Sequence, residues 1–276
     1  MTTTAQPRPP DPDELESIAV ALAEGAAQVV RDARGDAVDV SAKSTVTDLV
    51  TEIDRRTERW LVAEIARRRP GDAVLGEEGG GRAGSTRVRW VLDPIDGTVN
   101  FVLGLPQYAV SVAAEVDGVV VAGAVCNPVT GERFRAHRGG GAYLGDQRLT
   151  GPRDVPLPRA VVGTGFSYDA GQRARQIAVV APLLPRLADI RRLGASSLDI
   201  CFVAAGRIDG YFEAGLNEWD YAAGALVASE AGCQVTGLRG RPPSTRMVAV
   251  TGPGLAAELF GLLEALGADA VTELSR

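Results

Sequence analysis

The sequence has few of the residues on which several common kinds of catalysis depend. Its 276 residues include one histidine, His137, and one lysine, Lys43, although lysine and arginine together number 29. One histidine excludes a metal site built from several imidazoles, and it leaves a Ser-His-Asp triad with a single available base. In a chain that otherwise uses arginine, the single lysine indicates either a functional position or a chance remnant.

Cysteines and long apolar runs are also scarce. The three cysteines, Cys126, Cys201 and Cys233, lie far apart in apolar surroundings, which favours reduced, buried thiols over a disulfide framework. The sequence contains neither a secretory signal nor an apolar run of bilayer length, so we expect a cytoplasmic protein with no membrane partner. The net charge of −6 argues against nucleic acid as the main partner.

The apolar content is sufficient for a large core. Hydrophobic residues make up 45% of the chain and charged residues 23%, as in ordinary globular proteins, and the length corresponds to one or two domains. Residues 1–14 are polar and are expected to form a flexible tail. The proline-rich segment Pro152–Pro158 predicts a boundary between an N-terminal subdomain, 15–151, and a C-terminal subdomain, 152–276, which together form one catalytic unit.

The first half of the chain predicts two helices and a largely antiparallel sheet. Apolar residues recur at helical spacing from Leu15 to Val30 and from Ile53 to Ile65. Asp117-Gly118 lies between two apolar runs and indicates a hairpin. The expected strands are Ala73–Leu75, Val88–Leu92, Tyr108–Val116, Val119–Cys126, Phe134–Ala136 and Ala142–Leu144.

In the second half, strand and helix patterns alternate, which indicates an α/β layer. The expected strands are Ala160–Gly163, Ile190–Leu193, Ile208–Phe212 and Met247–Thr251. The expected helices are Arg173–Leu187, Ser196–Ala205, Tyr221–Ala231 and Leu255–Leu266. The predicted fold class is therefore α/β, with an α+β N-terminal half.

Several acidic residues lie where predicted strands end or helices begin, which is where α/β folds assemble their sites. Taken singly, each is more often a helix cap or a solvated charge, and Asp220 would make a good N-cap. Together they indicate a metal site, because converging carboxylates repel one another unless a cation lies between them. These acids are Glu77, Glu78, Asp93, Asp96, Glu213 and Asp220.

Three motifs, in this order, resemble the signatures of the inositol monophosphatase family. They are Gly76-Glu77-Glu78, Asp93-Pro94-Ile95-Asp96-Gly97-Thr98-Val99-Asn100-Phe101 and Trp219-Asp220-Tyr221-Ala222-Ala223-Gly224. The resemblance extends from about Leu15 to Leu266 and includes Lys43, Asp54 and Gly194–Glu213. It implies a layered αβαβα sandwich of the sugar-phosphatase type, a homodimer, and a Mg²⁺-dependent phosphatase that Li⁺ inhibits.

The resemblance also implies a ligand set for two to three Mg²⁺ ions, with Mn²⁺ as an alternative metal. Glu77, Asp93 and the backbone carbonyl of Ile95 would bind the first ion. Asp93, Asp96 and Asp220 would bind the second, and Glu77 would help to hold a third, weaker one.

The same resemblance implies roles for the residues around these ions. Thr98 and Glu77 would position and activate the attacking water, while the amides of Gly97 and Thr98 hold the phosphate. Asp54 would support the site through Thr98 or a water, and Lys43 would lie near the metal-bound waters.

The substrate implied by the resemblance is a small phosphorylated polyol or sugar. Glu213, Ala195, Ser196 and Asp220 would contact it, and a carboxylate such as Glu213 suits the hydroxyls of a polyol. We therefore expect hydrolysis of myo-inositol monophosphate by a metal-activated water, which needs no histidine. Ala195 departs from the Ser or Thr usual at this position, which leaves the exact substrate open.

Two kinds of alternative remain at this point. Within the family, the substrate could be fructose-1,6-bisphosphate, histidinol phosphate or 3′-phosphoadenosine-5′-phosphate. Outside catalysis, the chain could be a regulatory binding protein. Every expected metal position carries its acid, which favours an enzyme.

Overall fold

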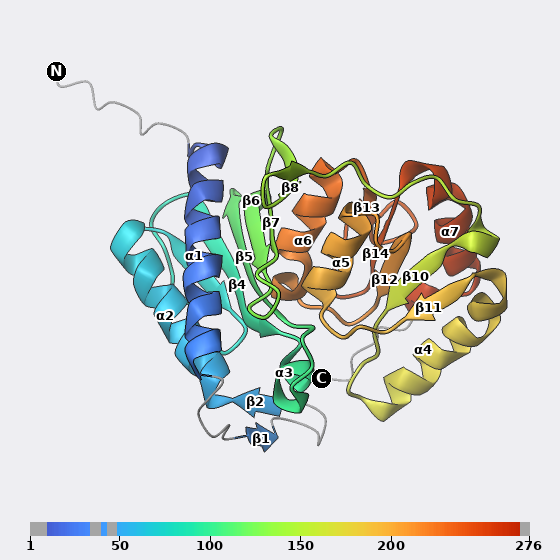
Figure 1. Ribbon diagram of the computed structural model, residues 1–276, viewed down its shortest axis with the longest axis horizontal. Coiled ribbons are helices and arrows are strands. Elements are labelled where there is room, and N and C mark those ends of the chain that lie inside the picture. The colour runs from blue at the N-terminus through green and yellow to red at the C-terminus, as the bar shows by residue number, and fades with distance from the viewer. Residues whose placement is uncertain (1–9, 34–39, 43–48, 271–276) are drawn as a thin grey trace.

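The computed structural model describes residues 10–33, 40–42 and 49–270 (Figure 1). The helices are α1 (Pro12–Ala33), α2 (Glu52–Arg68), α3 (Thr98–Leu103), α4 (Ala170–Leu183), α5 (Ser196–Ala204), α6 (Glu218–Glu230) and α7 (Pro253–Ala265). The strands of the first half are β1 (Val40–Ala42), β2 (Leu49–Thr51), β3 (Ala73–Gly76), β4 (Val88–Asp96), β5 (Ala109–Val116), β6 (Val119–Cys126), β7 (Arg133–His137), β8 (Gly141–Leu144) and β9 (Gln147–Arg148). Those of the second half are β10 (Val161–Thr164), β11 (Asp189–Arg191), β12 (Gly210–Glu213), β13 (Gln234–Thr236) and β14 (Val248–Thr251).

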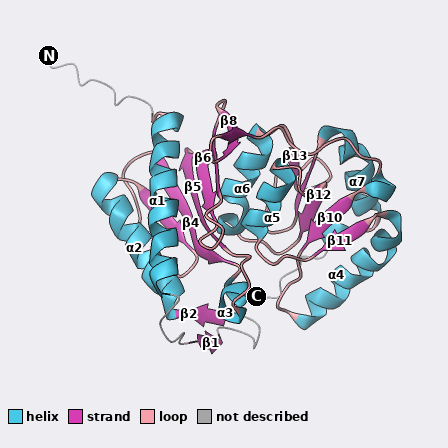
Figure 2. Cartoon of the chain, viewed as in Figure 1, coloured by secondary structure: helices cyan, strands magenta, loops and turns pink. Residues whose placement is uncertain are grey.

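Helices and sheets alternate in five layers, which confirms the predicted αβαβα sandwich (Figures 1 and 2). Helices α1 and α2 cover the outer face of a seven-stranded sheet. Helices α5 and α6 lie between this sheet and a five-stranded sheet, whose outer face is covered by α4 and α7. None of the described helices combines the length and the apolar character needed to cross a bilayer.

The seven-stranded sheet has the order β3-β4-β5-β6-β7-β8-β9 and is antiparallel except for the parallel pair β3–β4. The predicted hairpin is present between β5 and β6. Its turn residues Asp117 and Gly118 both have positive φ, 52° and 78°, as the two-residue turns that match the twist of a hairpin require. The antiparallel sheet expected for the first half is thus confirmed.

The five-stranded sheet has the order β11-β10-β12-β14-β13. Strand β10 is parallel to β11 and β12, whereas β14 runs antiparallel to β12 and β13. The α/β layer is confirmed, but the edge strand β13 was not predicted. Its three residues, Gln234–Thr236, carry too little apolar character to stand out in the sequence.

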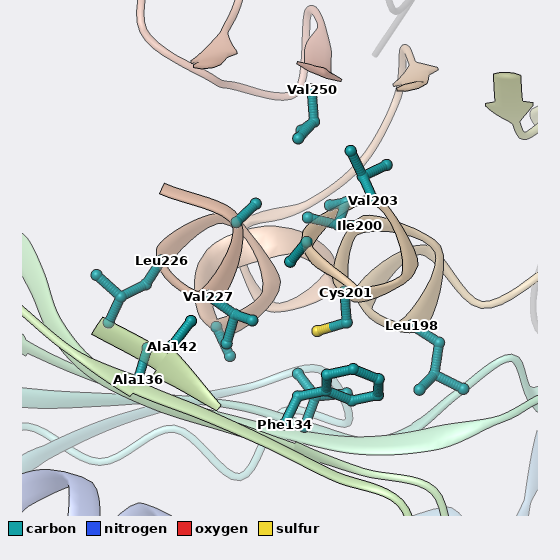
Figure 3. Close-up of a cluster of buried hydrophobic side chains, with 14 of the residues drawn as sticks. Phe134, Ala136, Ala142, Leu198, Ile200, Cys201, Val203, Leu226, Val227 and Val250 are labelled. Atoms are coloured by element: carbon teal, nitrogen blue, oxygen red, sulfur yellow. The ribbon is translucent and has the colours of Figure 1, made fainter. Parts of the chain in front are cut away.

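One apolar core joins the two halves of the chain through α5 and α6 (Figure 3). Phe134 from the first sheet lies below Cys201 and Leu198 of α5, and Val250 of the second sheet lies on the other side of the same helices. The first turns of α5 and α6 are thereby fixed relative to the strand ends of both sheets.

Several predicted boundaries were wrong. Helix α1 begins at Pro12 and not at Leu15. Proline is favourable at the first position of a helix, because the N–H groups of the first turn make no hydrogen bond within the helix. The predicted helix Arg173–Leu187 begins inside α4, which starts at Ala170, and extends past its end over a separate 3₁₀ turn, Leu184–Arg186. Strand β4 continues beyond Leu92 to Asp96, with consequences for the site. The subdomain boundary near Pro152 stays a prediction.

Candidate active site

Three elements bring acidic side chains to one place. Strands β3 and β4 are parallel neighbours, so Glu77, which follows β3, and Asp93 on β4 reach the same edge of the sheet. Asp220 arrives from the first turn of α6. One carboxylate oxygen from each of Asp93, Asp96 and Asp220 lies within 4.8 Å of the other two. Glu77 lines the same pocket.

An irregularity in β4 lets Asp93 and Asp96 share this pocket. Residues three apart in a regular strand point to opposite faces of the sheet. The pairing of β4 with β5 shifts between Asp93 and Asp96, around Pro94, which has no N–H for the ladder. Both acids therefore line the pocket, although the strand does not end at Leu92 as predicted.

The negative charges in this cluster repel one another. Asp93 is 1% exposed, and its Oδ1 accepts no hydrogen bond from any residue in the described part of the chain. Burial raises the pKa of Asp93 well above its usual value, and the charges of Glu77, Asp96 and Asp220 raise it further. The pKa of Asp220 is raised in the same way by burial and by Asp96. Hard oxygen donors with an unsatisfied buried member fit a divalent cation such as Mg²⁺.

Asp96 is bound to the N-terminus of α5. The N–H groups of Ser196 and Ser197 donate to its Oδ1 and Oδ2 at 3.2 and 2.7 Å, and the Ser197 hydroxyl donates to Oδ2 at 2.5 Å. Burial raises the pKa of Asp96, and these hydrogen bonds oppose the increase. The positive end of the helix thus holds this carboxylate in place. Ser196, expected to contact substrate, makes a contact to Asp96.

Asp220 is the third residue of α6 and not its N-cap. The helix begins at Glu218 after Asn217, whose N–H donates to Asp220 Oδ2 at 2.6 Å. The side chain therefore reaches back over the first turn, as in a capping box. This bond lowers the pKa of Asp220 but does not outweigh burial.

Gly97 joins β4 to α3, and Thr98 is the first residue of that helix. Gly97 has a φ of 91°, and a Cβ there would lie 3.0–3.1 Å from the carbonyls of Gln107 and Gly194 and from the Ala195 methyl. Ala195 is fully buried behind this turn, so its methyl shapes the pocket from beneath instead of lining it. The Thr98 hydroxyl donates to the Ile95 carbonyl at 3.0 Å.

The acid cluster forms one wall of a pocket of about 410 Å³. The rest of the lining comes from β12, the first turn of α5 and the segment after β10. Arg192 is the only basic side chain among the described residues that line the pocket, and it makes no ion pair within the described chain. The described lining thus offers many oxygen acceptors and one basic side chain.

Glu213 lies at the end of β12 and lines the pocket. The buried Tyr211 hydroxyl donates a hydrogen bond to its Oε2. Burial raises the pKa of Glu213 to about 7, while Tyr211 and the charge of Arg192 act in the opposite direction. Burial also raises the pKa of its neighbour Asp199 well above the usual value.

Asp54, like Ala195, is not among the residues that line the pocket. Asp54 is buried in the first turn of α2, close enough that its charge contributes to the raised pKa of Asp93. Lys43 lies outside the described residues. Sequence reasoning missed the parts played by Ser197, Arg192 and Asp199, because no local pattern distinguishes them from ordinary helix and strand residues.

Known proteins similar to this chain share most of its length. The sequence profile described as the inositol monophosphatase family matches residues 11–268. The inositol-1-monophosphatase of Mycobacterium leprae is 46% identical over 277 residues, covering 92% of this chain and 94% of the relative. The Nus factor SuhB of Pasteurella multocida is 40% identical over 228 residues, covering 81% and 85%. The structure of Mycobacterium tuberculosis SuhB has a TM-score of 0.80 and 43% identity, covering 94% of this chain and 99% of that one.

Proposed function

The chain belongs to the inositol monophosphatase family, and from this premise we propose that it hydrolyses myo-inositol monophosphate to inositol and phosphate. The family makes the chain a phosphoric monoester hydrolase. The observation that carries the proposal is the convergence of Asp93, Asp96 and Asp220 within 4.8 Å, with Glu77 in the same pocket.

We propose that these acids hold two to three Mg²⁺ ions. Glu77, Asp93 and the Ile95 carbonyl would hold the first, and Asp93, Asp96 and Asp220 the second. When bound, Mg²⁺ polarises the phosphoryl group and lowers the pKa of a water. The Ile95 carbonyl could bind a metal even though it accepts a hydrogen bond from the Thr98 hydroxyl, because a carbonyl oxygen has two lone pairs. Li⁺ inhibition is expected from competition for the second position.

Thr98 and Glu77 would orient the attacking water. Because the Thr98 hydroxyl donates its proton to Ile95, its oxygen is left to accept a hydrogen bond from that water. The Glu77 carboxylate would accept a hydrogen bond from the other O–H of the water. With both O–H groups held in this way, a lone pair of the water oxygen would point toward the phosphorus. The amides of Gly97 and Thr98 would hold the phosphate oxygens, and Asp54 would support the site from α2.

The leaving group would lie against the part of the pocket that β12 forms. Glu213 and Asp220 are acceptors for the hydroxyls of a polyol, and Tyr211 fixes the Glu213 carboxylate in the pocket wall. Ser196 and the buried Ala195 would act through the shape of the wall. Lys43 would act near the metals. These assignments favour a neutral, hydroxyl-rich leaving group over an apolar one.

Fructose-1,6-bisphosphate is the second candidate substrate. The guanidinium of Arg192, which makes no ion pair within the described residues, could donate to the second phosphate, since arginine binds phosphate oxygens in a bidentate manner. The named inositol-1-monophosphatase relative favours the first candidate. A relative named Nus factor SuhB keeps a regulatory binding role as the non-catalytic alternative.

The decisive experiment compares phosphate release from inositol-1-phosphate, fructose-1,6-bisphosphate and histidinol phosphate, with and without Mg²⁺. We expect the highest kcat/KM on inositol-1-phosphate and no release without a divalent ion. A higher value on fructose-1,6-bisphosphate would select the second candidate, and no turnover on any substrate would favour the binding role. Homodimer formation and a cytoplasmic location stay predictions, to be checked by light scattering and by cell fractionation.

A further inference from the structure

Glu58 is a buried carboxylate on α2 that none of the steps above uses. It is 3% exposed. Its Oε2 accepts the N–H of Glu78 at 2.8 Å, and its Oε1 accepts the N–H of Gly80 at 2.7 Å. Both amides belong to the turn that follows β3 and begins with Glu77.

This turn is built around the Glu58 carboxylate. A Cβ at Gly76 would lie 2.3 Å from Glu58 Oε2, and a Cβ at Gly80 would lie 2.5 Å from Oε1. The missing side chains at these two glycines therefore create the space that the carboxylate fills. The glycine of the Gly76-Glu77-Glu78 motif thus has a structural reason for its identity.

The backbone of Glu77 is fixed on both sides as a result. Its own N–H donates to the Leu92 carbonyl of β4 at 3.3 Å, and the next N–H, that of Glu78, donates to Glu58. Hydrogen bonds from backbone amides to a carboxylate are stronger than neutral ones. The direction of the Cα–Cβ bond of Glu77 is thereby set by strand β4 and by the Glu58 side chain of α2.

We propose that Glu58 is a positioning residue that holds Glu77 in the geometry required to bind the metal. This inference rests on the proposed role of Glu77 as a metal ligand. Adding another acid close to a cluster of acids would otherwise be unfavourable, and the two backbone bonds offset that cost. Residues that orient a ligand in this way commonly contribute about 10- to 100-fold to metal affinity.

The first test is Glu58→Gln, measured by calorimetric titration of Mg²⁺ into the metal-free protein without substrate. A glutamine keeps the shape but presents an NH₂ group to one of the two N–H donors, so one bond is lost. We expect Mg²⁺ binding weaker by about 10-fold and faster hydrogen exchange at the amides of Glu78 and Gly80. The control is Glu64→Gln on the same helix, whose carboxylate binds Arg67 and Arg68 and no other described residue, and it should change neither quantity.

A second variant reaches the same contact without altering α2. Gly80→Ala would push the carboxylate away from the turn, whereas a Cβ at Gly81 makes only an ordinary contact, 3.5 Å from the Val74 carbonyl. We expect Gly80→Ala to weaken Mg²⁺ binding as Glu58→Gln does, and Gly81→Ala to leave it unchanged. If Glu58→Gln does not fold, the alanine pair decides the question.

A double-mutant cycle separates positioning from general stability. If Glu58 acts through Glu77, then Glu58→Gln should weaken Mg²⁺ binding in the wild type but add nothing in a Glu77→Gln background. Equal losses in both backgrounds, or no loss in either, would overturn the inference. If Glu77→Gln itself leaves Mg²⁺ binding intact, the proposed ligand role fails instead, so the two failures are distinguishable.

Discussion

At the scale of single residues, the pocket acids differ in what balances their charge. Asp96 has four hydrogen-bond donors from α5 within reach, and Glu213 accepts from Tyr211. Asp93 lies at the centre of the cluster, and its Oδ1 has no hydrogen-bond donor among the described residues. A bound cation would therefore stabilise the Asp93 carboxylate more than the carboxylates of Asp96 and Glu213. This difference supports the proposal that Asp93 is the acid shared between the two metals.

Replacing a proposed ligand should remove turnover and keep the fold. Asp93→Asn and Asp220→Asn are each expected to lower kcat/KM by about 10³-fold or more, since metal charge stabilisation contributes several kcal/mol and each 1.4 kcal/mol is tenfold. The metal-free variants should melt at or above the wild-type temperature, because one like charge has left the cluster. Phosphate release and circular dichroism test both points. Near-normal turnover of either variant would rule out its ligand role.

Substrate affinity should depend on pH through Glu213. Its pKa is raised to about 7, so the carboxylate becomes protonated as the pH falls through neutrality and loses acceptor strength toward substrate hydroxyls. We expect KM to increase by up to about tenfold per pH unit on the acidic side. Because the charge of Arg192 lowers this pKa, Arg192→Gln should move the inflection to higher pH.

Glu213→Gln is the control for this profile, because it cannot titrate. The substrate phosphate titrates alike with both enzymes, so the ratio of the two KM values isolates Glu213. A ratio that stays constant across neutral pH would show that Glu213 does not bind the hydroxyls as a carboxylate.

The sequence predicted those site residues that stand in contiguous motifs. Glu77, Asp93, Asp96, Thr98 and Asp220 all line the pocket, as expected. The contact between Ser197 and Asp96 spans 101 positions, and it forms only because α5 packs against the end of β4. Ala195, in contrast, was placed among the substrate contacts, but its methyl is buried beneath Gly97. Neither outcome can be read from local spacing.

At the scale of elements, the site depends on how closely α5 and α6 pack between the sheets (Figure 1). Gly224 of α6 allows the close approach, because a Cβ there would lie 2.9 Å from the Ser197 carbonyl of α5 and 3.3 Å from Ile200. On the side of α6 that faces the first sheet, Gly123 of β6 packs closely against Ala223, because a Cβ at Gly123 would lie 3.0 Å from the Ala223 Cα. Small residues thus set the spacing between the helix that binds Asp96 and the helix that carries Asp220.

Gly224→Ala should therefore destabilise the protein, by about 1–3 kcal/mol as overpacking in a core does. It should also weaken Mg²⁺ binding, because the displaced carbonyl belongs to the first turn of α5. Gly261→Ala in α7 is the matched control, since Gly261 is exposed and a Cβ there meets nothing within 4 Å. Alanine at that site should raise stability by up to about 1 kcal/mol. Urea unfolding measures both, and equal effects of the two substitutions would contradict the packing argument.

Periodicity predicted the existence of most elements but not their ends. The run of apolar residues predicted that β4 ends at Leu92, because Asp93 and Asp96 are polar. Backbone pairing with β5 nevertheless continues through both acids. The loop after β3 is tied to that strand by two backbone hydrogen bonds between Val74 and Arg82, at 2.8 and 2.9 Å. These features depend on backbone pairing, to which hydropathy is insensitive.

At the scale of the whole molecule, the two sheets share the helices between them. Buried residues of both halves form a continuous cluster around α5 and α6 (Figure 3). Alternation of strands and helices in the second half predicted an α/β layer, and the resemblance supplied the order of the layers. The sequence pattern alone could not show that helices of the second half complete the core of the first. That arrangement requires long-range contacts between distant segments.

This shared core leads to a prediction for metal binding and unfolding. Mg²⁺ at about 100 times its Kd should add about 2.7 kcal/mol, which corresponds to an increase in Tm of about 5–11 °C for a chain of this size. The ligands come from β4 in the first sheet and from α6 between the sheets, so the transition should shift as one unit. Asp93→Asn should abolish the shift, whereas Glu64→Gln should retain it. Scanning calorimetry that resolved two transitions, with only one moved by Mg²⁺, would show that the halves unfold separately.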